Sequence, residues 1–371
     1  MNIAYVCVDP GIPVFGTKGA CVHMQEVIRE LLRRGHNVTV FAVRKGTFIP
    51  DDLRELEVRE FPIEAKETAE RELAQQQRSE EISAEIIRGN FDLIYERYSL
   101  FSTVIATSQI PGILEVNAPL IEEQRTHRAL HDIASASDAL QLQVSHARVT
   151  VCVSENVRTW VSHRTVGGRV VTVPNGVNPE RIVPQPEDTD GAPVVTFVGT
   201  LKPWHGVSDL LIAASYANHP WRIRILGDGP ERPALEHLAE KLGLSVDFRG
   251  AIAPAEMPKH LAGTAIAVAP YPAAQTDSDQ YFSPLKLFEY MAAGLPIVAS
   301  QVGQIPSILG TAGELVPPSH PEALALAIDG LVADPGRRKI LGDQARALAV
   351  REHSWQQVVT TMLRLAGVEV T

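Results

Sequence analysis

The sequence predicts an α/β protein built from two doubly wound parallel sheets, and three observations support this fold class. Short apolar runs alternate with helical patterns along the chain, which is typical of parallel strands joined by helices that cover both faces of a sheet. These runs form two sets, separated by a stretch at 173–193 that is rich in Pro, Asp and Gly. A chain of 371 residues is also too long for one ordinary core, since domains average roughly 150 residues.

Each strand candidate is a short apolar run bounded by turn residues. In the first half the candidates are residues 3–8, 37–43, 92–96, 112–116 and 148–153. In the second half they are residues 194–199, 222–227, 265–270 and 295–300. We place the domain boundary near Asn178, and the residues that directly follow each strand are the first candidates for function, because open α/β sheets bind ligands there. The segment from 51 to 88 is dense in Glu, Arg and Gln and is expected to be a solvated helix face without chemistry.

Composition excludes several function classes. Hydrophobic residues make up 45% of the chain and charged residues 21%, as in soluble globular proteins. The formal net charge of −10 argues against a nucleic-acid partner, which would need a basic face. Cys7, Cys21 and Cys152 lie far apart without CxxC spacing, which favours a reducing compartment over a disulfide framework or a zinc site.

The first residues, MNIAYVCVDP, lack a basic region and enter a strand pattern directly. No apolar run approaches about 18 residues, the length that a membrane-spanning helix needs. We therefore expect a cytoplasmic protein, with peripheral contact at the inner face of the membrane left open.

The most informative segment is 281–300, YFSPLKLFEYMAAGLPIVAS. Ser283 is a preferred N-cap and Pro284 suits the first helical position. Apolar side chains cover nearly every side of this helix except at Lys286 and Glu289. A cation in the first turn opposes the helix dipole unless an anion binds there, and a carboxylate one turn later can accept hydrogen bonds from two adjacent hydroxyls. A phosphate beside a diol describes a nucleotide; the alternative is a surface Lys/Glu pair at i,i+3.

Glycine-rich loops form a second group of candidates. The loop after the first strand contains Gly11, Gly16 and Gly19, which let backbone N–H groups approach a phosphate or a sugar hydroxyl at a helix N-terminus. The order Thr17-Lys18 is the reverse of the order in an ATP-hydrolysing P-loop, and a purely structural glycine turn is the alternative.

Two loops of the second half carry further candidates. Lys202 and His205 follow the strand at 194–199, where they can neutralise a diphosphate as cations or simply lie on a solvent-facing loop. Gly227 and Ile252 lie in two later turns that expose backbone groups.

Polar residues also follow strands of the first half. Arg97 and Tyr98 come after one strand, and Glu115 and Asn117 after the next. They can contact an acceptor or the reacting sugar, and a capping or inter-strand role is the equally weighted alternative.

Asp277 and Asp279 form an Asp-x-Asp pattern that can hold a divalent metal beside a diphosphate. Because they lie in a polar loop where Asp is common in turns, we predict no metal site.

Together these segments resemble the retaining glycosyltransferases of family 4, which have the two-domain GT-B architecture. The resemblance covers essentially the whole chain and rests on the segments FVGTLKPWHG, PNGV, ILGDGP and SPLKLFEYMAAGLPIVAS. Its strongest part begins at Glu289 and matches the end of the family's Glu-x7-Glu signature. It implies two Rossmann-like domains facing a central cleft: an acceptor-binding domain at 1–178, a donor-binding domain at 179–352, and a C-terminal helix at 353–371 that returns to the first domain.

The resemblance also implies residue roles. Glu289 binds the ribose hydroxyls, the turn from Pro284 to Lys286 meets the donor phosphates, and Gly16 and Gly19 approach these phosphates from the other domain. The donor-nucleotide set is Gly16, Gly19, Gly227, Ile252, Ser283, Pro284, Leu285 and Glu289. The catalytic set is Asn117, Lys202, His205 and Lys286, and the donor-sugar and acceptor set is Lys18, Arg97, Tyr98, Glu115, Tyr281 and Phe282.

Three departures from the family pattern bear on the donor. The first Glu of the signature falls at Tyr281, the family's Arg and Lys after FVG are replaced by Thr200 and His205, and a histidine common in the first domain appears as Asn117 or a neighbour. Such changes recur in a subgroup associated with bacterial polysaccharide and secondary-metabolite glycosylation. Loss of a carboxylate beside the hexose removes a repulsion against an acidic sugar, which suggests a uronic acid donor.

The function implied is a hexosyltransferase that moves a hexosyl or hexuronosyl group from a nucleoside diphosphate sugar, above all UDP-glucose or UDP-glucuronate. The acceptor is a glycan, a glycolipid or a small molecule, and no cofactor or metal is required. The family reacts by front-face substitution; double displacement would need a carboxylate nucleophile, for which Glu115 is the nearest candidate. Two alternatives stay open, an enzyme like UDP-N-acetylglucosamine 2-epimerase and a catalytically idle nucleotide-sugar binding protein.

Overall fold

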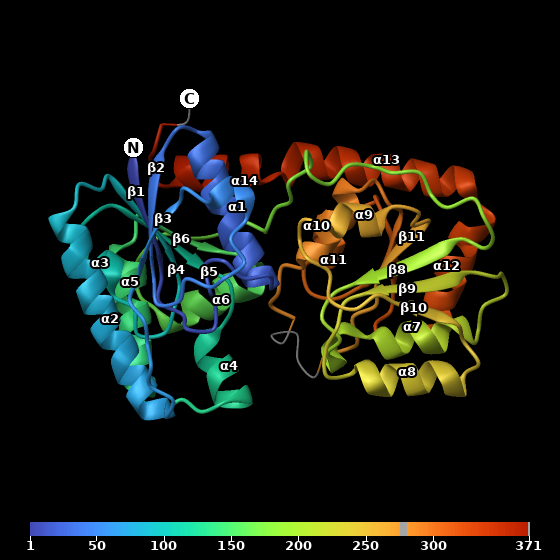
Figure 1. Cartoon of the computed structure of the whole chain (residues 1–371), viewed down its shortest axis with the longest axis horizontal. Coiled ribbons are helices and arrows are strands. Elements are labelled where there is room, and N and C mark those ends of the chain that lie inside the picture. Colours follow the sequence, from blue (N-terminus) through green and yellow to red (C-terminus); the bar gives the residue numbers. More distant parts are fainter. Residues whose placement is uncertain (275–279, 370–371) are drawn as a thin grey trace. The chain divides into compact units, whose positions relative to one another are not determined.

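The computed structural model describes residues 1–274 and 280–369, so Asp277 and Asp279 lie outside the described residues. The chain divides into two compact units (Figure 1). Unit 1 comprises Met1–Asn175, Tyr281–Ser283 and Trp355–Thr371, and unit 2 comprises Gly176–Gln280 and Pro284–Ser354. The chain thus passes between units a few residues before the boundary near Asn178, and its last helix belongs to unit 1.

Unit 1 contains a parallel sheet in the order β3-β2-β1-β4-β5-β6-β7. Its strands are β1 (Asn2–Cys7), β2 (Asn37–Ala42), β3 (Glu57–Glu60), β4 (Leu93–Arg97), β5 (Gly112–Val116), β6 (Val149–Cys152) and β7 (Val170–Thr172). Its helices are α1 (Gly19–Arg33), η1 (Asp51–Leu53), α2 (Thr68–Arg88), α3 (Val104–Ser108), α4 (Leu120–His127), α5 (Ile133–His146), α6 (Glu155–Arg164) and α14 (Trp355–Leu365). The strand order changes direction between β1 and β4, which are neighbours.

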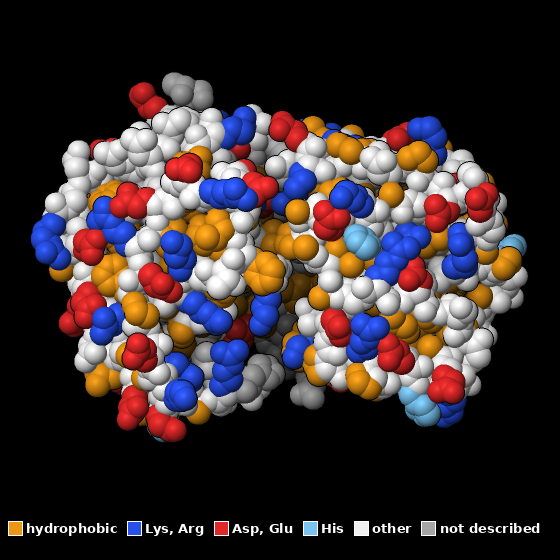
Figure 2. All heavy atoms as spheres, viewed as in Figure 1, with side chains coloured by type: hydrophobic (Ala, Val, Ile, Leu, Met, Phe, Trp, Pro, Cys, Tyr) orange, Lys and Arg blue, Asp and Glu red, His pale blue; other side chains and the backbone are white. Residues whose placement is uncertain are grey.

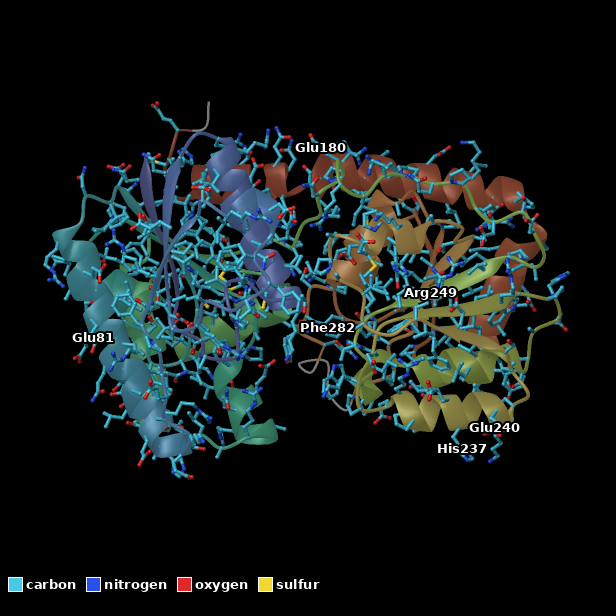
Figure 3. The ribbon with its side chains drawn as sticks, viewed as in Figure 1. Glu81, Glu180, His237, Glu240, Arg249 and Phe282 are labelled. Carbon is cyan, nitrogen blue, oxygen red and sulfur yellow. The ribbon has the colours of Figure 1, made fainter. Side chains whose placement is uncertain are left out.

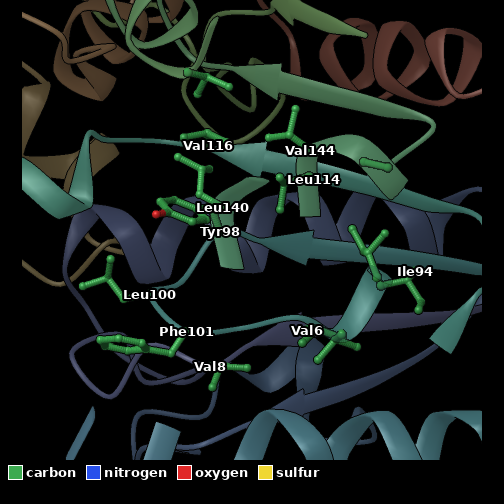
Figure 4. Packing of buried hydrophobic residues seen from close by; sticks show 14 of the residues in the cluster. Val6, Val8, Ile94, Tyr98, Leu100, Phe101, Leu114, Val116, Leu140 and Val144 are labelled. Atoms are coloured by element: carbon green, nitrogen blue, oxygen red, sulfur yellow. The ribbon is translucent and has the colours of Figure 1, made fainter. Parts of the chain in front are cut away.

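Alternate residues of the unit 1 strands enter two different layers. Val6, Ile94 and Leu114 belong to a buried cluster that continues into α2, α3, α5 and α6 (Figure 4). On the opposite face Tyr5 and Tyr95 stack with ring centroids 5.1 Å apart, and the Tyr95 hydroxyl donates to the sulfur of Met362 on α14 at 3.2 Å. Helices therefore cover both faces of the sheet, as the apolar strands predict.

Unit 2 contains a parallel sheet in the order β10-β9-β8-β11-β12-β13. Its strands are β8 (Val194–Val198), β9 (Arg222–Leu226), β10 (Val246–Phe248), β11 (Ile266–Ala269), β12 (Ile297–Ser300) and β13 (Glu314–Val316). Its helices are η2 (Pro203–His205), α7 (Val207–Ala214), α8 (Arg232–Lys241), α9 (Met257–Leu261), α10 (Leu285–Ala292), α11 (Ile305–Leu309), α12 (Pro321–Ala333) and α13 (Pro335–Glu352). Helices α7, α8 and α12 supply the buried side chains of one face.

Acidic and basic side chains intermingle on the face shown in Figure 2, and His237 and Glu240 on α8 point into solvent (Figure 3). Within the described residues, no helix combines the length and the apolar character that crossing a membrane requires.

Candidate functional site

The site in unit 2 begins where the strand order changes direction, between β8 and β11. Tyr290 of α10 fills the place where these two strands separate. The backbone N–H of Val198 donates to the Tyr290 hydroxyl at 2.7 Å, and this hydroxyl donates to the carbonyl oxygen of Val268 at 3.2 Å. Helix α10 is therefore anchored at the carboxyl ends of β8 and β11, the place at which open α/β sheets bind ligands.

The start of α10 corrects the capping pattern predicted for Ser283 and Pro284. Pro284 is the N-cap and the helix begins at Leu285, and no side chain of the described residues caps it. The Ser283 hydroxyl instead accepts a hydrogen bond from the backbone N–H of Asn175 at 3.0 Å, and its carbonyl accepts one from the Asn175 side-chain amide at 2.8 Å. The first turn of α10 therefore presents backbone N–H groups that an anion can use.

Lys286 occupies an aromatic box beside this turn. Its side chain is buried, and its Nζ lies 4.2 Å from the ring centroid of Phe197 on β8 and 4.9 Å from that of Tyr271 after β11. No described residue accepts a hydrogen bond from Nζ. Burial lowers the pKa of Lys286 to about 7, and Glu289 only partly offsets this effect. A buried amine with three unused donors is the electrostatic complement of an oxyanion.

Glycines bring the loops after β8 and β9 close to this amine. Gly199 has φ 144°, and a Cβ there would lie 2.8 Å from Lys286 Nζ. Gly227 has φ 156°, and a Cβ there would lie 1.8 Å from the carbonyl oxygen of Gly199. Packing between the two loops thus explains Gly227 without a ligand, and its contact with a nucleotide stays a prediction.

Lys202 and His205 differ in the charge they can offer. Lys202 Nζ lies 5.4 Å from the ring centroid of Trp204. His205 Nδ1 donates to the carbonyl oxygen of Thr200, and burial, Lys286 and Lys202 lower the pKa of His205 to about 4. The prediction of a cationic His205 is therefore wrong for the ligand-free protein: the ring is neutral near pH 7 and presents Nε2 as an acceptor.

The remaining donor candidates surround the same end of the sheet. Leu285 and Glu289 are half-buried on α10. An isolated antiparallel bridge joins Gly227 to Gly250, which brings the turn after β9 to the turn after β10 that contains Arg249 (Figure 3) and Ile252. Their contacts with a nucleotide stay predictions.

Tyr281 and Phe282 belong to unit 1. The Tyr281 hydroxyl donates to the carboxylate of Glu123 on α4, and its carbonyl oxygen accepts a hydrogen bond from the Ser154 hydroxyl at 2.5 Å. Phe282, labelled in Figure 3, is half-buried in the same segment. The residue that replaces the first Glu of the signature therefore already has a carboxylate partner within unit 1.

Glu115 is an internal ion-pair partner through one oxygen, while its Oε2 has no hydrogen-bond partner among the described residues. Its predicted contact with a sugar stays a prediction. Its carboxylate is fully buried and accepts a hydrogen bond from His23 Nε2 at 2.6 Å. Burial would raise the pKa of Glu115, but His23 and Arg97 lower it below its usual range. The edge of Trp355 on α14 packs against the His23 ring at a centroid distance of 4.8 Å. The sequence pattern does not reveal this pair, because a single His on the apolar face of a helix usually belongs to the core.

The other predicted residues of unit 1 separate into two groups. Tyr98 is buried within the core cluster (Figure 4), its hydroxyl has no hydrogen-bond partner among the described residues, and its predicted acceptor contact stays a prediction. Arg97 is 6% exposed, and its Nη1 finds no hydrogen-bond acceptor among the described residues. Both polar atoms of the Asn117 side chain also lack a described partner. Arg97 and Asn117 thus keep hydrogen-bonding groups available at the ends of β4 and β5.

The glycine-rich loop leads into α1. Lys18 is the N-cap and Gly19 the first helical residue, and no side chain of the described residues caps this end. Gly16 packs so closely that a Cβ there would lie 2.6 Å from the Cys21 sulfur. The loop can therefore present N–H groups, while internal packing already requires Gly16. Among the described residues, no group of three or more His, Cys, Asp and Glu side chains is placed to hold a metal ion.

Both halves of the chain match glycosyltransferase family models. Residues 17–181 match Glycosyltransferase Family 4, and residues 192–334 match Glycosyl transferases group 1. The chain belongs to the family 4 glycosyltransferases. The predicted family is therefore confirmed.

Curated relatives are moderately similar. An exopolysaccharide phosphotransferase from Streptomyces coelicolor is 28% identical, over 70% of this chain and 28% of that protein. A D-inositol 3-phosphate glycosyltransferase from Corynebacterium urealyticum is 32% identical, over 47% of this chain and 42% of that protein. The chain thus spans less than half the length of these two relatives. An MMP alpha-(1->4)-mannosyltransferase from Mycolicibacterium hassiacum is 26% identical, over 73% of this chain and 69% of that protein.

Solved structures confirm the GT-B fold class. Sucrose-phosphate synthase from Thermosynechococcus elongatus has a TM-score of 0.73 at 19% identity, covering 98% of both chains. HepE from Anabaena, solved in complex with UDP and glucose, has a TM-score of 0.74 at 18% identity, covering 99% of both chains.

Proposed function

We propose that this glycosyltransferase is a retaining enzyme that moves a hexosyl or hexuronosyl group from a UDP-sugar to a carbohydrate, glycolipid or small-molecule acceptor. The observation that carries the proposal is Lys286: a buried amine without a described hydrogen-bond acceptor, beside the uncapped start of α10. The donor diphosphate occupies this place, and Glu289 binds the ribose one turn further along the helix.

The relatives support a nucleotide-sugar donor and leave two nucleotides to compare. Two mycobacterial relatives are described as GDP-mannose-dependent mannosyltransferases, whereas the Anabaena HepE structures contain UDP, or UDP-glucose. We choose UDP because the Anabaena HepE structures share the fold over 99% of this chain, whereas the GDP-mannose-dependent relatives match 50% of it or less.

The proposed reaction breaks the bond between the anomeric carbon and the donor phosphate oxygen, while the acceptor oxygen bonds to the same face of that carbon. Lys286 and the N–H groups of α10 stabilise the negative charge that develops on the departing diphosphate. The acceptor proton passes to a phosphate oxygen of the leaving group. The Nε2 atom of neutral His205 accepts a hydrogen bond from a hydroxyl of the donor sugar.

The state of Glu115 favours front-face substitution. Double displacement needs a carboxylate nucleophile beneath the anomeric carbon. The sequence candidate for this role, Glu115, is fully buried and bonded to His23, so it supports the alternative in which the leaving group and the attacking acceptor meet on one face.

A binding panel tests the donor site. UDP, GDP, UDP-glucose and UDP-glucuronate are added to the wild type, to Lys286→Ala, and to Lys259→Ala as the matched control, because Lys259 is an exposed lysine of α9 that is already paired with Glu256. A ligand at a hundredfold excess over its Kd stabilises a protein by about 2.7 kcal/mol. We expect UDP to raise Tm in the wild type and in Lys259→Ala, and the shift to be lost in Lys286→Ala.

Two results would contradict the proposal. One is that no nucleoside diphosphate raises Tm; the other is that Lys286→Ala responds to UDP as the wild type does. Turnover of UDP-glucuronate above UDP-glucose would support the acidic donor, and the reverse order would reject it while leaving the UDP site intact.

A further inference from the structure

Unit 1 contains a cavity of about 200 Å³ that the donor site does not explain. Its walls come from the loop after β1, the first turns of α2, the loop after β4, and α4 with the segment that follows it. Strands β1 and β4 are the neighbours between which the strand order of this sheet changes direction. The cavity therefore lies at the switch point of unit 1, where an open α/β sheet is expected to bind a ligand.

One wall of the cavity is apolar. Leu100 and Phe101 are buried lining residues, and Figure 4 shows Phe101 near Val8, the residue that directly follows β1. Phe101 has φ 65°, a left-handed conformation that is strained for a non-glycine residue. Such strain persists where the surrounding structure holds a residue in place, and it clusters at binding sites.

The polar wall offers hydrogen-bond donors without partners. The side chains of Arg71, Gln75, Gln124 and Arg128 line the cavity and make no hydrogen bond or ion pair with any residue in 1–274 or 280–369. Gln75 is only 8% exposed, so its amide faces the cavity rather than bulk water. Helix α2 starts at Thr68, another lining residue, and no described side chain caps it.

The carboxylates of the same cavity are already engaged by backbone groups. The two Glu72 oxygens accept hydrogen bonds from the N–H groups of His131 and Asp132, each at 2.9 Å. Asp9 Oδ1 accepts one from the N–H of Gly11 at 2.7 Å. These carboxylates already accept hydrogen bonds from the protein, whereas the guanidinium groups donate none to any described residue. A ligand in the cavity would therefore need to supply hydrogen-bond acceptors, above all anionic ones.

We propose that this cavity is the acceptor subsite and that it takes a sugar-sized acceptor carrying an oxyanion, either a phosphate ester or a carboxylate. Arg71, Arg128 and the start of α2 bind the oxyanion, the Gln75 and Gln124 amides bind sugar hydroxyls, and the Phe101 wall packs on the apolar face of the ring. The volume suits one sugar ring, since pockets for larger ligands run from about 300 Å³ upward. The assignment to an acceptor rests on the proposed function, and it replaces the expectation that the segment 51–88 carries no chemistry.

Direct titration without donor tests the subsite. The probes are glucose 6-phosphate, glucuronate, glucose and inorganic phosphate, each titrated calorimetrically into the wild type, Arg71→Gln and Arg128→Gln. Arg125→Gln is the matched control, because Arg125 is an exposed arginine of α4 that does not line the cavity. We expect one or both anionic sugars to bind at least about tenfold more tightly than glucose, and each of the two cavity variants to weaken this binding about tenfold.

The comparison of glucose 6-phosphate with glucuronate identifies the oxyanion. Three results would each overturn the proposal. Glucose binds as tightly as both anionic sugars, inorganic phosphate binds as tightly as glucose 6-phosphate, or Arg71→Gln and Arg128→Gln bind the anionic sugars as tightly as the wild type does. Arg71→Lys, which keeps the charge but not the bidentate geometry, should bind with intermediate affinity and guards against a folding defect in Arg71→Gln. UDP binding is measured on the same samples. If the wild type does not bind UDP, the proposed function is rejected. If the wild type binds UDP but binds no anionic sugar, only the subsite is rejected.

Discussion

Donor affinity should fall steeply as pH rises, because Lys286 must be protonated to hold a diphosphate. In the ligand-free protein burial lowers the pKa of Lys286 to about 7 from its ordinary 10.5, and no described residue accepts a hydrogen bond from its Nζ. A bound diphosphate supplies the missing anion and returns the pKa toward 10.5 or above. The complex therefore holds the proton across a pH range in which the free protein loses it.

The magnitude follows from proton linkage. Between pH 7 and pH 9 the fraction of free protein with charged Lys286 falls from about one half to about one hundredth, while the complex stays charged, so the Kd for UDP should rise about fiftyfold. This range lies above the phosphate pKa of about 6, so the charge of UDP itself changes little. Near pH 8.5 binding should take up close to one proton.

Calorimetric titration of UDP at pH 7, 8 and 9, in buffers of different ionisation enthalpy, measures both quantities. Lys286→Arg is the matched variant, because its guanidinium stays charged throughout this range, and its affinity for UDP should be nearly constant with pH. A Kd for the wild type that stays constant between pH 7 and pH 9, or a release of protons on binding, would refute the reasoning.

Four further results are expected. Lys286 has a lower pKa in the folded than in the unfolded chain, so its burial lowers the free energy of unfolding most below pH 7. This loss of stability fades between pH 7 and pH 10.5. Lys286→Met should therefore raise Tm of the ligand-free protein by more at pH 6 than at pH 10, measured by calorimetry. Gly199→Ala places a Cβ 2.8 Å from Nζ and should weaken UDP binding at least about tenfold, whereas Gly330→Ala, at a helical position with open space, should not. His23→Leu and Glu115→Leu should each lower the free energy of unfolding by about 3–5 kcal/mol, measured by urea denaturation. The double variant should lose less than the sum of the two single variants, because it leaves neither partner buried alone. Transfer from UDP-glucose should persist in EDTA; loss of activity that Mg²⁺ restores would reject metal independence.

The sequence by itself determined the central strands of both sheets. Nine apolar runs predict β1, β2, β4, β5, β6, β8, β9, β11 and β12, and all nine are present. The strands without such a run, β3, β7, β10 and β13, are the four edges of the two sheets, and most of their residues are partly or fully exposed. An apolar run signals burial on both faces, and an edge strand does not need it.

Only the tertiary structure decided what surrounds each polar residue. The helical pattern singles out Lys286, but the box around it comes from Phe197 on β8 and from Tyr271, which follows β11. Glu115 looks like a ligand contact from its place at the end of a strand, yet its partner His23 is 92 residues away in the chain. Local periodicity reports whether a side chain is buried, since burial recurs with the period of the helix or strand. Whether a buried polar group has a partner depends on neighbours that only the folded chain brings together, and that is why the amine of Lys286, unpaired among the described residues, and the ion-paired carboxylate of Glu115 could not be told apart before the fold was known.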